Sequence, residues 1–251
     1  MKIKELCQYL DEFLDVRRYR DYAPNGLQVE GRENVERIVT GVTACAALID
    51  QAIELDADAI LVHHGYFWKN EDARVVGLKA RRLKALLKHD INLLAYHLPL
   101  DGHPVVGNNA QLGQLLELKG AALDAEVLAQ GLVWHAYLDR PLAVEQFHRH
   151  VAEKLGRVPL HIAGGPREIQ HVAWCSGAAQ HYINELAPYN VDLYFSGEIS
   201  ESTVHVAQEA GLHYFAAGHH ATERYGVKAL GDHLFDRFEI QPQFVDIDNP
   251  V

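Results

Sequence analysis

The sequence predicts an α/β fold built from two similar, intimately packed α/β units. Short β-rich runs alternate with amphipathic helical segments along the chain, a pattern typical of crossover connections in a largely parallel sheet. A histidine, three intervening residues and a carboxylate occur twice after such runs, in His97–Asp101 and in His219–Glu223. Both offsets are 122 residues (219 − 97 and 223 − 101). We therefore expect an internal duplication.

The first half contains alternating elements after an initial helix. Apolar residues between Ile3 and Leu14 recur at helical spacing, and the loop 21–29 follows, with turn residues at Pro24 and Asn25–Gly26. This loop is either a surface turn or part of a site. Strands are expected at 37–42, 57–62 and 91–96, and helices at 43–53 and 76–87. The second strand leads to His63 and His64, and the third leads to His97.

The second half repeats this alternation. Helices are expected from Gly107 onward and at 144–155, 182–186 and 204–210, and strands at 127–137, 171–175, 191–195, 213–217 and 235–245. A domain junction is expected within 118–166. We place it so that the units are 1–125 and 126–251.

The two halves align over two consecutive strand-helix units. Matching Ala57–Ile60 with Val191–Tyr194 gives an offset of 134 (192 − 58), which places His64 opposite Glu198. Two such units can pack about a pseudo-twofold axis and share one cleft. The alternative is a chance similarity between βα units.

Charge and cysteine usage restrict the class of protein. The net charge of −11 repels polyanions, so nucleic acid is not the expected partner, although basic residues cluster at 17–20 and 79–84. The 3 cysteines are widely spaced within apolar segments, as expected of reduced thiols. Neither a leader nor an apolar run of membrane-spanning length is present, so we expect a cytoplasmic protein.

Histidines and carboxylates just past strand ends form the candidate site. Imidazole nitrogens and carboxylate oxygens together suit divalent zinc, iron, manganese, cobalt or nickel. Five such groups predict two metal ions per chain, around which the two units would form a shared dinuclear cleft. His63 and His64 point to opposite sides if the strand pleat continues. Either both bind metal or one faces inward as packing.

Six ordered motifs carry a resemblance to a known family. They are Asn25–Val29, His63–Gly65, His97–Asp101, Gly107–Asn109, Ser196–Glu198 and Gly218–Glu223. Together they resemble the GTP cyclohydrolase 1 type 2 homologues, the NIF-three-like proteins, over nearly the entire chain. The match is nearest to the short bacterial members.

The resemblance implies a dinuclear metal centre in a toroidal homohexamer whose metal sites face an internal cavity. The metal ligands that it implies are His63, His64, Asp101, His219 and Glu223. It also implies that His97 and Glu198 line the site, and we take these two as the candidate catalytic residues. Glu198 would act either as a general base or as a group that orients His63 or His219.

Two functions remain open at this stage. One is a dinuclear metal-dependent hydrolase that acts on a nucleotide-like or heterocyclic small molecule through metal-activated water. The other is a metal-bound oligomeric scaffold that binds a protein or nucleic-acid partner without turnover. The sequence contains no P-loop and no purine-recognition motif, so it does not specify a substrate.

Overall fold

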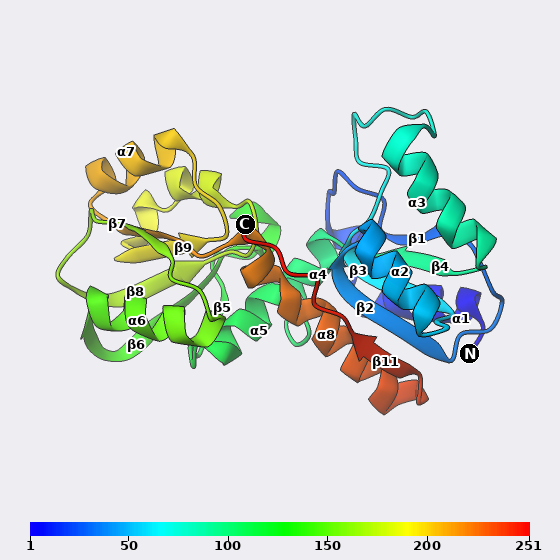
Figure 1. Ribbon diagram of the computed structural model, residues 1–251. Coiled ribbons are helices and arrows are strands. Elements are labelled where there is room, and N and C mark those ends of the chain that lie inside the picture. Colours follow the sequence, from blue (N-terminus) through cyan, green and yellow to red (C-terminus); the bar gives the residue numbers. More distant parts are fainter. The chain divides into compact units, whose positions relative to one another are not determined.

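The computed structural model describes residues 1–251 and confirms an α/β fold (Figure 1). The chain divides into two compact units, each with a sheet of its own. The first unit consists of Met1–Gly107 and Gly226–Asp248. The second consists of Asn108–Tyr225 and Asn249–Val251.

The first unit contains a five-stranded sheet in the order β1-β4-β3-β2-β11. Its strands are β1 (Gly26–Val29), β2 (Arg37–Thr43), β3 (Ala59–His64), β4 (Asn92–Ala95) and β11 (Gln241–Phe244). Its helices are α1 (Ile3–Phe13), η1 (Val16–Arg18), α2 (Ala46–Glu54), α3 (Gly77–Lys88), α4 (Leu98–Gly102) and the later part of α8 (His219–Phe238). All neighbouring strands are parallel except β1, which is antiparallel to β4.

Alternation along the central strand divides the core of the first unit into two layers. Leu61 packs in a cluster with residues of α1 and α8. Its neighbours Ile60 and Val62 pack in a second cluster with residues of α2 and α3. Successive side chains point to opposite faces of a strand, so helices on both faces bury the sheet. This burial explains why the strand is apolar throughout until it reaches His63.

The second unit contains a six-stranded mixed sheet in the order β5-β6-β8-β9-β10-β7. Its strands are β5 (Ala121–Ala122), β6 (Trp134–Ala143), β7 (Leu160–Ile162), β8 (Glu168–Trp174), β9 (Leu193–Ser196) and β10 (His213–Ala216). Its helices are α5 (Asn108–Leu115), η2 (Ala129–Gly131), α6 (Val144–Leu155), η3 (Gln180–Glu185), η4 (Ala187–Tyr189), α7 (Glu201–Ala210) and the first turns of α8. Only β8, β9 and β10 pair in parallel, so the expectation of a largely parallel sheet is wrong for this unit.

The division between the units differs from the expected boundary at 125/126. It falls between Gly107 and Asn108, and the segment Gly226–Asp248 returns to the first unit. The reason is packing. Leu112 and Leu116 belong to the core cluster of the second unit, while β11 pairs with β2 of the first. The chain passes back to the first unit between Tyr225 and Gly226, inside the continuous helix α8, where no linker marks the change.

Several elements also differ from their expected ranges. The strand expected at 127–137 is β6, which begins at Trp134, and the helix expected at 182–186 is the 3₁₀ segment η3. The closing strand expected at 235–245 begins with the last turn of α8, which ends at Phe238, and only Gln241–Phe244 forms a strand. The helical course of residues 224–238 was not anticipated from the sequence.

The strand ladders support the internal duplication. Ile38 pairs with Ala59 between β2 and β3, and Val172 pairs with Leu193 between β8 and β9. Both offsets are 134 residues (172 − 38 and 193 − 59). The two pairs of strands therefore share one register, as the sequence alignment predicts.

Two equivalent aspartates reinforce this match. Asp58 Oδ2 accepts hydrogen bonds from the backbone N–H groups of residues 36 and 37, both at 3.0 Å. Asp192 Oδ2 accepts them from residues 170 and 171, both at 2.8 Å. Each carboxylate thus holds the neighbouring parallel strand in the same way, just before its first ladder pair at Ile38 or Val172.

The strands that precede the two histidine motifs, β4 and β10, show that these motifs are not in equivalent register. Ala59 pairs with Asn92, whereas Leu193 pairs with His213, so the offset there is 121 (213 − 92) and not 122. His97 therefore corresponds to Gly218, and His219 lies one residue later. The two His-x-x-x-carboxylate motifs agree in sequence but leave their strands at different positions.

Candidate metal centre

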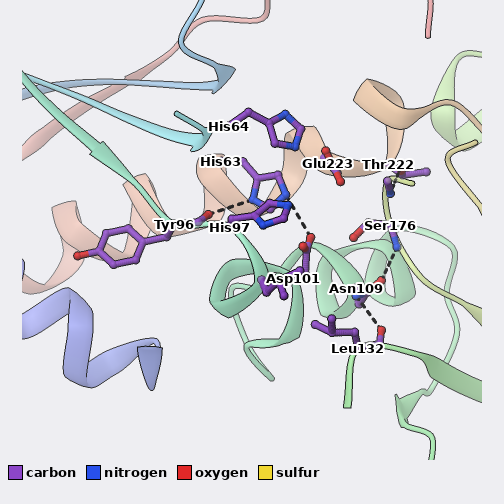
Figure 2. A network of polar contacts seen from close by, with 12 residues as sticks. His63, His64, Tyr96, His97, Asp101, Asn109, Leu132, Ser176, Thr222 and Glu223 are labelled. Atoms are coloured by element: carbon purple, nitrogen blue, oxygen red, sulfur yellow. Dashed lines mark hydrogen bonds and ion pairs between the residues drawn. The ribbon is translucent and has the colours of Figure 1, made fainter. Parts of the chain in front are cut away.

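His63 and Asp101 form a buried pair in the first unit. His63 Nδ1 lies 3.0 Å from the carbonyl oxygen of Tyr96, and a carbonyl only accepts, so Nδ1 carries the proton and donates (Figure 2). This leaves the lone pair of neutral His63 on Nε2, which is 3.4 Å from Asp101 Oδ1. Two lone pairs at this distance are stabilised by a cation between or beside them, either a proton or a metal ion.

His64 and His97 complete a cluster of three histidines with His63. One ring nitrogen from each lies within 4.8 Å of the other two. The ring centroid of His63 is 4.6 Å from that of His64 and 5.0 Å from that of His97. Both adjacent histidines therefore reach the same place although they lie at successive strand positions, and metal binding by both stays a prediction.

Parallel strand ends bring this cluster together. β2, β3 and β4 are parallel neighbours, so their carboxyl ends lie at one edge of the sheet. Thr43 at the end of β2 is paired with His64, and its Oγ1 lies 3.1 Å from His64 Nδ1. If this Nδ1 carries the proton, the Thr43 hydroxyl oxygen accepts its hydrogen bond, and Nε2 of His64 is then the ligand atom.

His97 is held by a loop that precedes β1. Its Nδ1 donates to Asp21 Oδ1 at 2.8 Å, and its backbone N–H donates to Asn25 Oδ1 at 2.7 Å. Burial alone would raise the pKa of Asp21. The hydrogen bond and charge of His97 outweigh it, with further hydrogen bonds from Asn25 and the Leu98 N–H, and lower the pKa to about 2. Asp21 is therefore a carboxylate at neutral pH.

His219 lies between two carboxylates in the second unit. Its Nδ1 donates to Glu198 Oε1 at 2.6 Å, and its Nε2 lies 3.0 Å from Glu223 Oε2, one helical turn along α8. Burial lowers the pKa of His219, but Glu223 and then Glu198 outweigh that effect and raise it to about 9. The two carboxylates thus stabilise a cation at Nε2 of His219. Glu223 itself is only 3% exposed.

A glycine fits tightly against this pair. Gly177 has φ +64°, and a Cβ at that position would overlap Glu223 Oε1 and lie 3.1 Å from His219 Nε2. Its N–H donates to Thr222 Oγ1 at 3.0 Å. Any side chain there would displace the carboxylate. Neither Gly177 nor Asp21 was identified as a site residue from the sequence, because each acts through a neighbour and belongs to no metal-ligand motif.

The donor set fits a borderline divalent metal. In each unit, imidazole nitrogen and carboxylate oxygen approach each other at 3.4 Å and 3.0 Å. Two ligands of one zinc-like ion, with bonds of about 2.0–2.2 Å, lie roughly 3–3.6 Å apart. Nδ1 of each histidine contacts a hydrogen-bonding partner, an arrangement that orients metal-binding imidazoles.

The predicted site residues fall into two groups. His63, His64, His97 and Asp101 lie together in the first unit, and Glu198, His219 and Glu223 in the second. His220 follows His219 directly in the sequence, and its N–H donates to the carbonyl oxygen of Val251 at 2.9 Å. Residues that could hold a metal ion are therefore present in the chain.

Comparison with known proteins shows which family this arrangement comes from. A family model described as Duf34/NIF3 (NGG1p interacting factor 3) matches residues 1–250. The chain belongs to the Duf34/NIF3 family. The resemblance predicted from the six motifs is confirmed.

Curated relatives of this NIF3-family chain carry the name GTP cyclohydrolase 1 type 2 homolog. The Pseudomonas aeruginosa protein is 53% identical over 251 residues, which are 99% of this chain and 98% of that protein. The Allochromatium vinosum protein is 51% identical over 249 residues, 99% of this chain and 97% of that protein. The Escherichia coli K12 protein is 49% identical over 252 residues, with all of both chains covered.

Solved structures agree over the whole chain. The protein described as ybgI, of unknown function, superposes with a TM-score of 0.95 at 48% identity and covers 100% of both chains. TTHA1606 from Thermus thermophilus gives a TM-score of 0.88 at 34% identity, again with 100% of both chains covered. None of the helices in this NIF3-family chain combines the length and apolar character that crossing a membrane requires.

Proposed function

We propose that this protein is a metal-dependent hydrolase that acts on a nucleotide-like or heterocyclic small molecule. The ligands would be His63, His64 and Asp101 from the first unit and His219 and Glu223 from the second, holding two divalent ions. The observation that carries the proposal is that Nδ1 of each of these histidines contacts a hydrogen-bonding partner while Nε2 of His63 and of His219 approaches a buried carboxylate. The relatives' name supports a nucleotide-like ligand.

The bound metals would supply the electrophilic part of the chemistry. Divalent ions of this type polarise a carbonyl, phosphoryl or ring carbon and lower the pKa of water. Zinc, iron, manganese, cobalt and nickel all suit nitrogen and oxygen donors.

His97 would handle protons in this reaction. With the proton of its neutral form on Nδ1 and donated to Asp21, its Nε2 can accept a proton from water and return it to a leaving group. Asp21 would stabilise the imidazolium that forms. The three-histidine cluster places this nitrogen among the ligands of the first unit.

Glu198 would orient His219 and not act as the base. Its carboxylate accepts the Nδ1–H of His219 at 2.6 Å, which fixes Nε2 as the ligand atom. A general-base role remains the alternative for Glu198, whose side chain is 35% exposed. The two roles differ in whether its substitution changes metal affinity or turnover.

A scaffold function is the second candidate. The family description names an interacting factor, which supports binding of a protein partner without turnover.

We also propose a homohexameric toroid, as the family resemblance implies, and a cytoplasmic location, which the 3 free cysteines support. Light scattering of purified protein measures the hexamer directly.

The decisive experiment measures metal content and then turnover. Elemental analysis of protein purified without chelator should approach about two equivalents per chain. The metal-loaded protein is then tested against nucleotides, phosphoesters and cyclic amides, with Asp101→Ala as the control. Metal content near zero after reconstitution would contradict the metal site, and metal binding with no turnover of any substrate class would favour the scaffold.

A further inference from the structure

The loop from Asp21 to Asn25 makes three hydrogen bonds to the segment His97–Leu98. Asp21 Oδ1 accepts from His97 Nδ1 at 2.8 Å, and Oδ2 accepts from the Leu98 N–H at 3.0 Å. Asn25 Oδ1 accepts from the His97 N–H at 2.7 Å, and its Nδ2 donates to Asp21 Oδ2 at 2.9 Å. The ring and the backbone of His97 are thus both held from this loop, 72 to 77 residues away in sequence.

The same loop is itself braced at Asp21. The N–H groups of Tyr22 and Ala23 donate to Oδ1 at 2.7 Å and 3.2 Å. The Asp21 side chain is only 5% exposed, and that of His97 only 8%. A buried carboxylate with this many donors has a single orientation, so it imposes that orientation on the imidazole.

Two carboxylates orient histidines in this chain, and they act on different rings. Glu198 holds His219, whereas Asp21 holds His97, and His63 and His64 contact the neutral Tyr96 carbonyl and Thr43 hydroxyl. A carboxylate that accepts Nδ1–H favours that tautomer, which leaves the lone pair on Nε2. His97 is therefore a histidine of the first unit whose Nδ1–H is accepted by a carboxylate.

We propose that Asp21 is a positioning residue that fixes His97 as the Nδ1–H tautomer, with the lone pair on Nε2, among the ligands of the first unit. Asn25 is the second part of this clamp, because it holds both the His97 backbone and Asp21. The part of the proposal that concerns metal rests on the proposed function. The tautomer of His97 depends only on its hydrogen bond to Asp21.

The test compares Asp21→Asn with Asp15→Asn, which makes the same chemical change at an exposed aspartate for which no side-chain hydrogen bond is found. The ¹⁵N resonances of the His97 ring are measured in metal-free protein and assigned by comparison with His97→Gln. In the wild type and in Asp15→Asn, Nδ1 should carry the proton. In Asp21→Asn the ring should exchange between both tautomers. Asp21→Glu, which retains a carboxylate, should recover part of the Nδ1–H signal, and it serves as the test if Asp21→Asn does not fold.

A chelator competition with Zn²⁺ provides the second readout. Because His97 is proposed to handle protons and is not among the proposed ligands, Asp21→Asn should bind Zn²⁺ as tightly as Asp15→Asn does, and a loss of about 10–100-fold would place His97 among the ligands. An unchanged His97 tautomer in Asp21→Asn overturns the clamp whatever the metal affinity. Wild-type protein that binds no Zn²⁺ overturns the proposed function, while the tautomer measurement still decides the role of Asp21.

Discussion

Replacing Gly177 by alanine tests how tightly Glu223 is placed. The new Cβ would overlap Glu223 Oε1, so the carboxylate must move away from His219 Nε2, which it now approaches at 3.0 Å. Gly211→Ala is a matched control, because Gly211 has a similar φ of +72° against +64° for Gly177 but nothing lies within 4 Å of its Cβ position.

The magnitudes follow from two separate costs. Alanine in the left-handed region costs about 1–2 kcal/mol, and both variants should lose this much. Overlap with a buried side chain adds about 1–3 kcal/mol in Gly177→Ala alone. Since Glu223 is also a proposed ligand, the affinity for Zn²⁺ should fall about 10–100-fold in this variant and remain unchanged in Gly211→Ala.

Urea unfolding and chelator competition measure the two effects on the same samples. Gly177→Ala should have the lower free energy of unfolding and the weaker metal binding. If both variants lose equal stability and bind Zn²⁺ as the wild type does, then Glu223 is not held against Gly177 and the geometry of the second group is wrong.

Three further predictions concern other parts of the chain. Asp58→Ala should cost about 2–4 kcal/mol of unfolding free energy, because two backbone N–H groups lose a charged acceptor. The pKa of Asp58 is lowered in the folded state, since backbone hydrogen bonds and Arg32 outweigh burial, so its contribution is present above the unfolded pKa and is lost as pH falls through the lower folded pKa. Urea titrations at pH 7 and in acid compare the unfolding free energies of the wild type and Asp58→Ala. Equal losses at both pH values would contradict a contribution that depends on the Asp58 carboxylate. Asp101→Ala should lower metal content more than His220→Ala. An equal loss in elemental analysis would mean that, of the adjacent histidines His219 and His220, the wrong one was chosen as the ligand. Glu198→Gln should weaken metal binding with turnover per bound metal little changed; a loss of roughly 10²–10⁴ in rate with both metals retained would instead identify it as the base.

Strand-level features were predictable because they depend on local patterns. The offset of 134 residues was visible in sequence, and the ladders and the paired roles of Asp58 and Asp192 agree with it. The candidate metal ligands were found because histidines and carboxylates follow strand ends.

Long-range geometry was not predictable in the same way. The repeated motif suggested that His97 and His219 are equivalent, but the ladders differ by one residue, and the two rings use different partners. Asp21 and Gly177 carry no motif, since their roles depend on contacts that only the fold creates. The boundary inside α8 was missed because an uninterrupted helix gives no signal of a change in packing partner.

The return of Gly226–Asp248 to the first unit bears on how the protein is synthesised. Val227, Leu230 and Leu234 belong to the core cluster that also contains residues of α1, and β11 pairs with β2 some 200 positions earlier in the chain. The first unit to leave the ribosome is therefore the last whose core can be completed, whereas Asn108–Tyr225 has nearly all of its contacts within one continuous stretch. Until the late segment emerges, the apolar residues of α1 and one edge of β2 lack their partners, and we expect this interval to be when the chain depends most on chaperones.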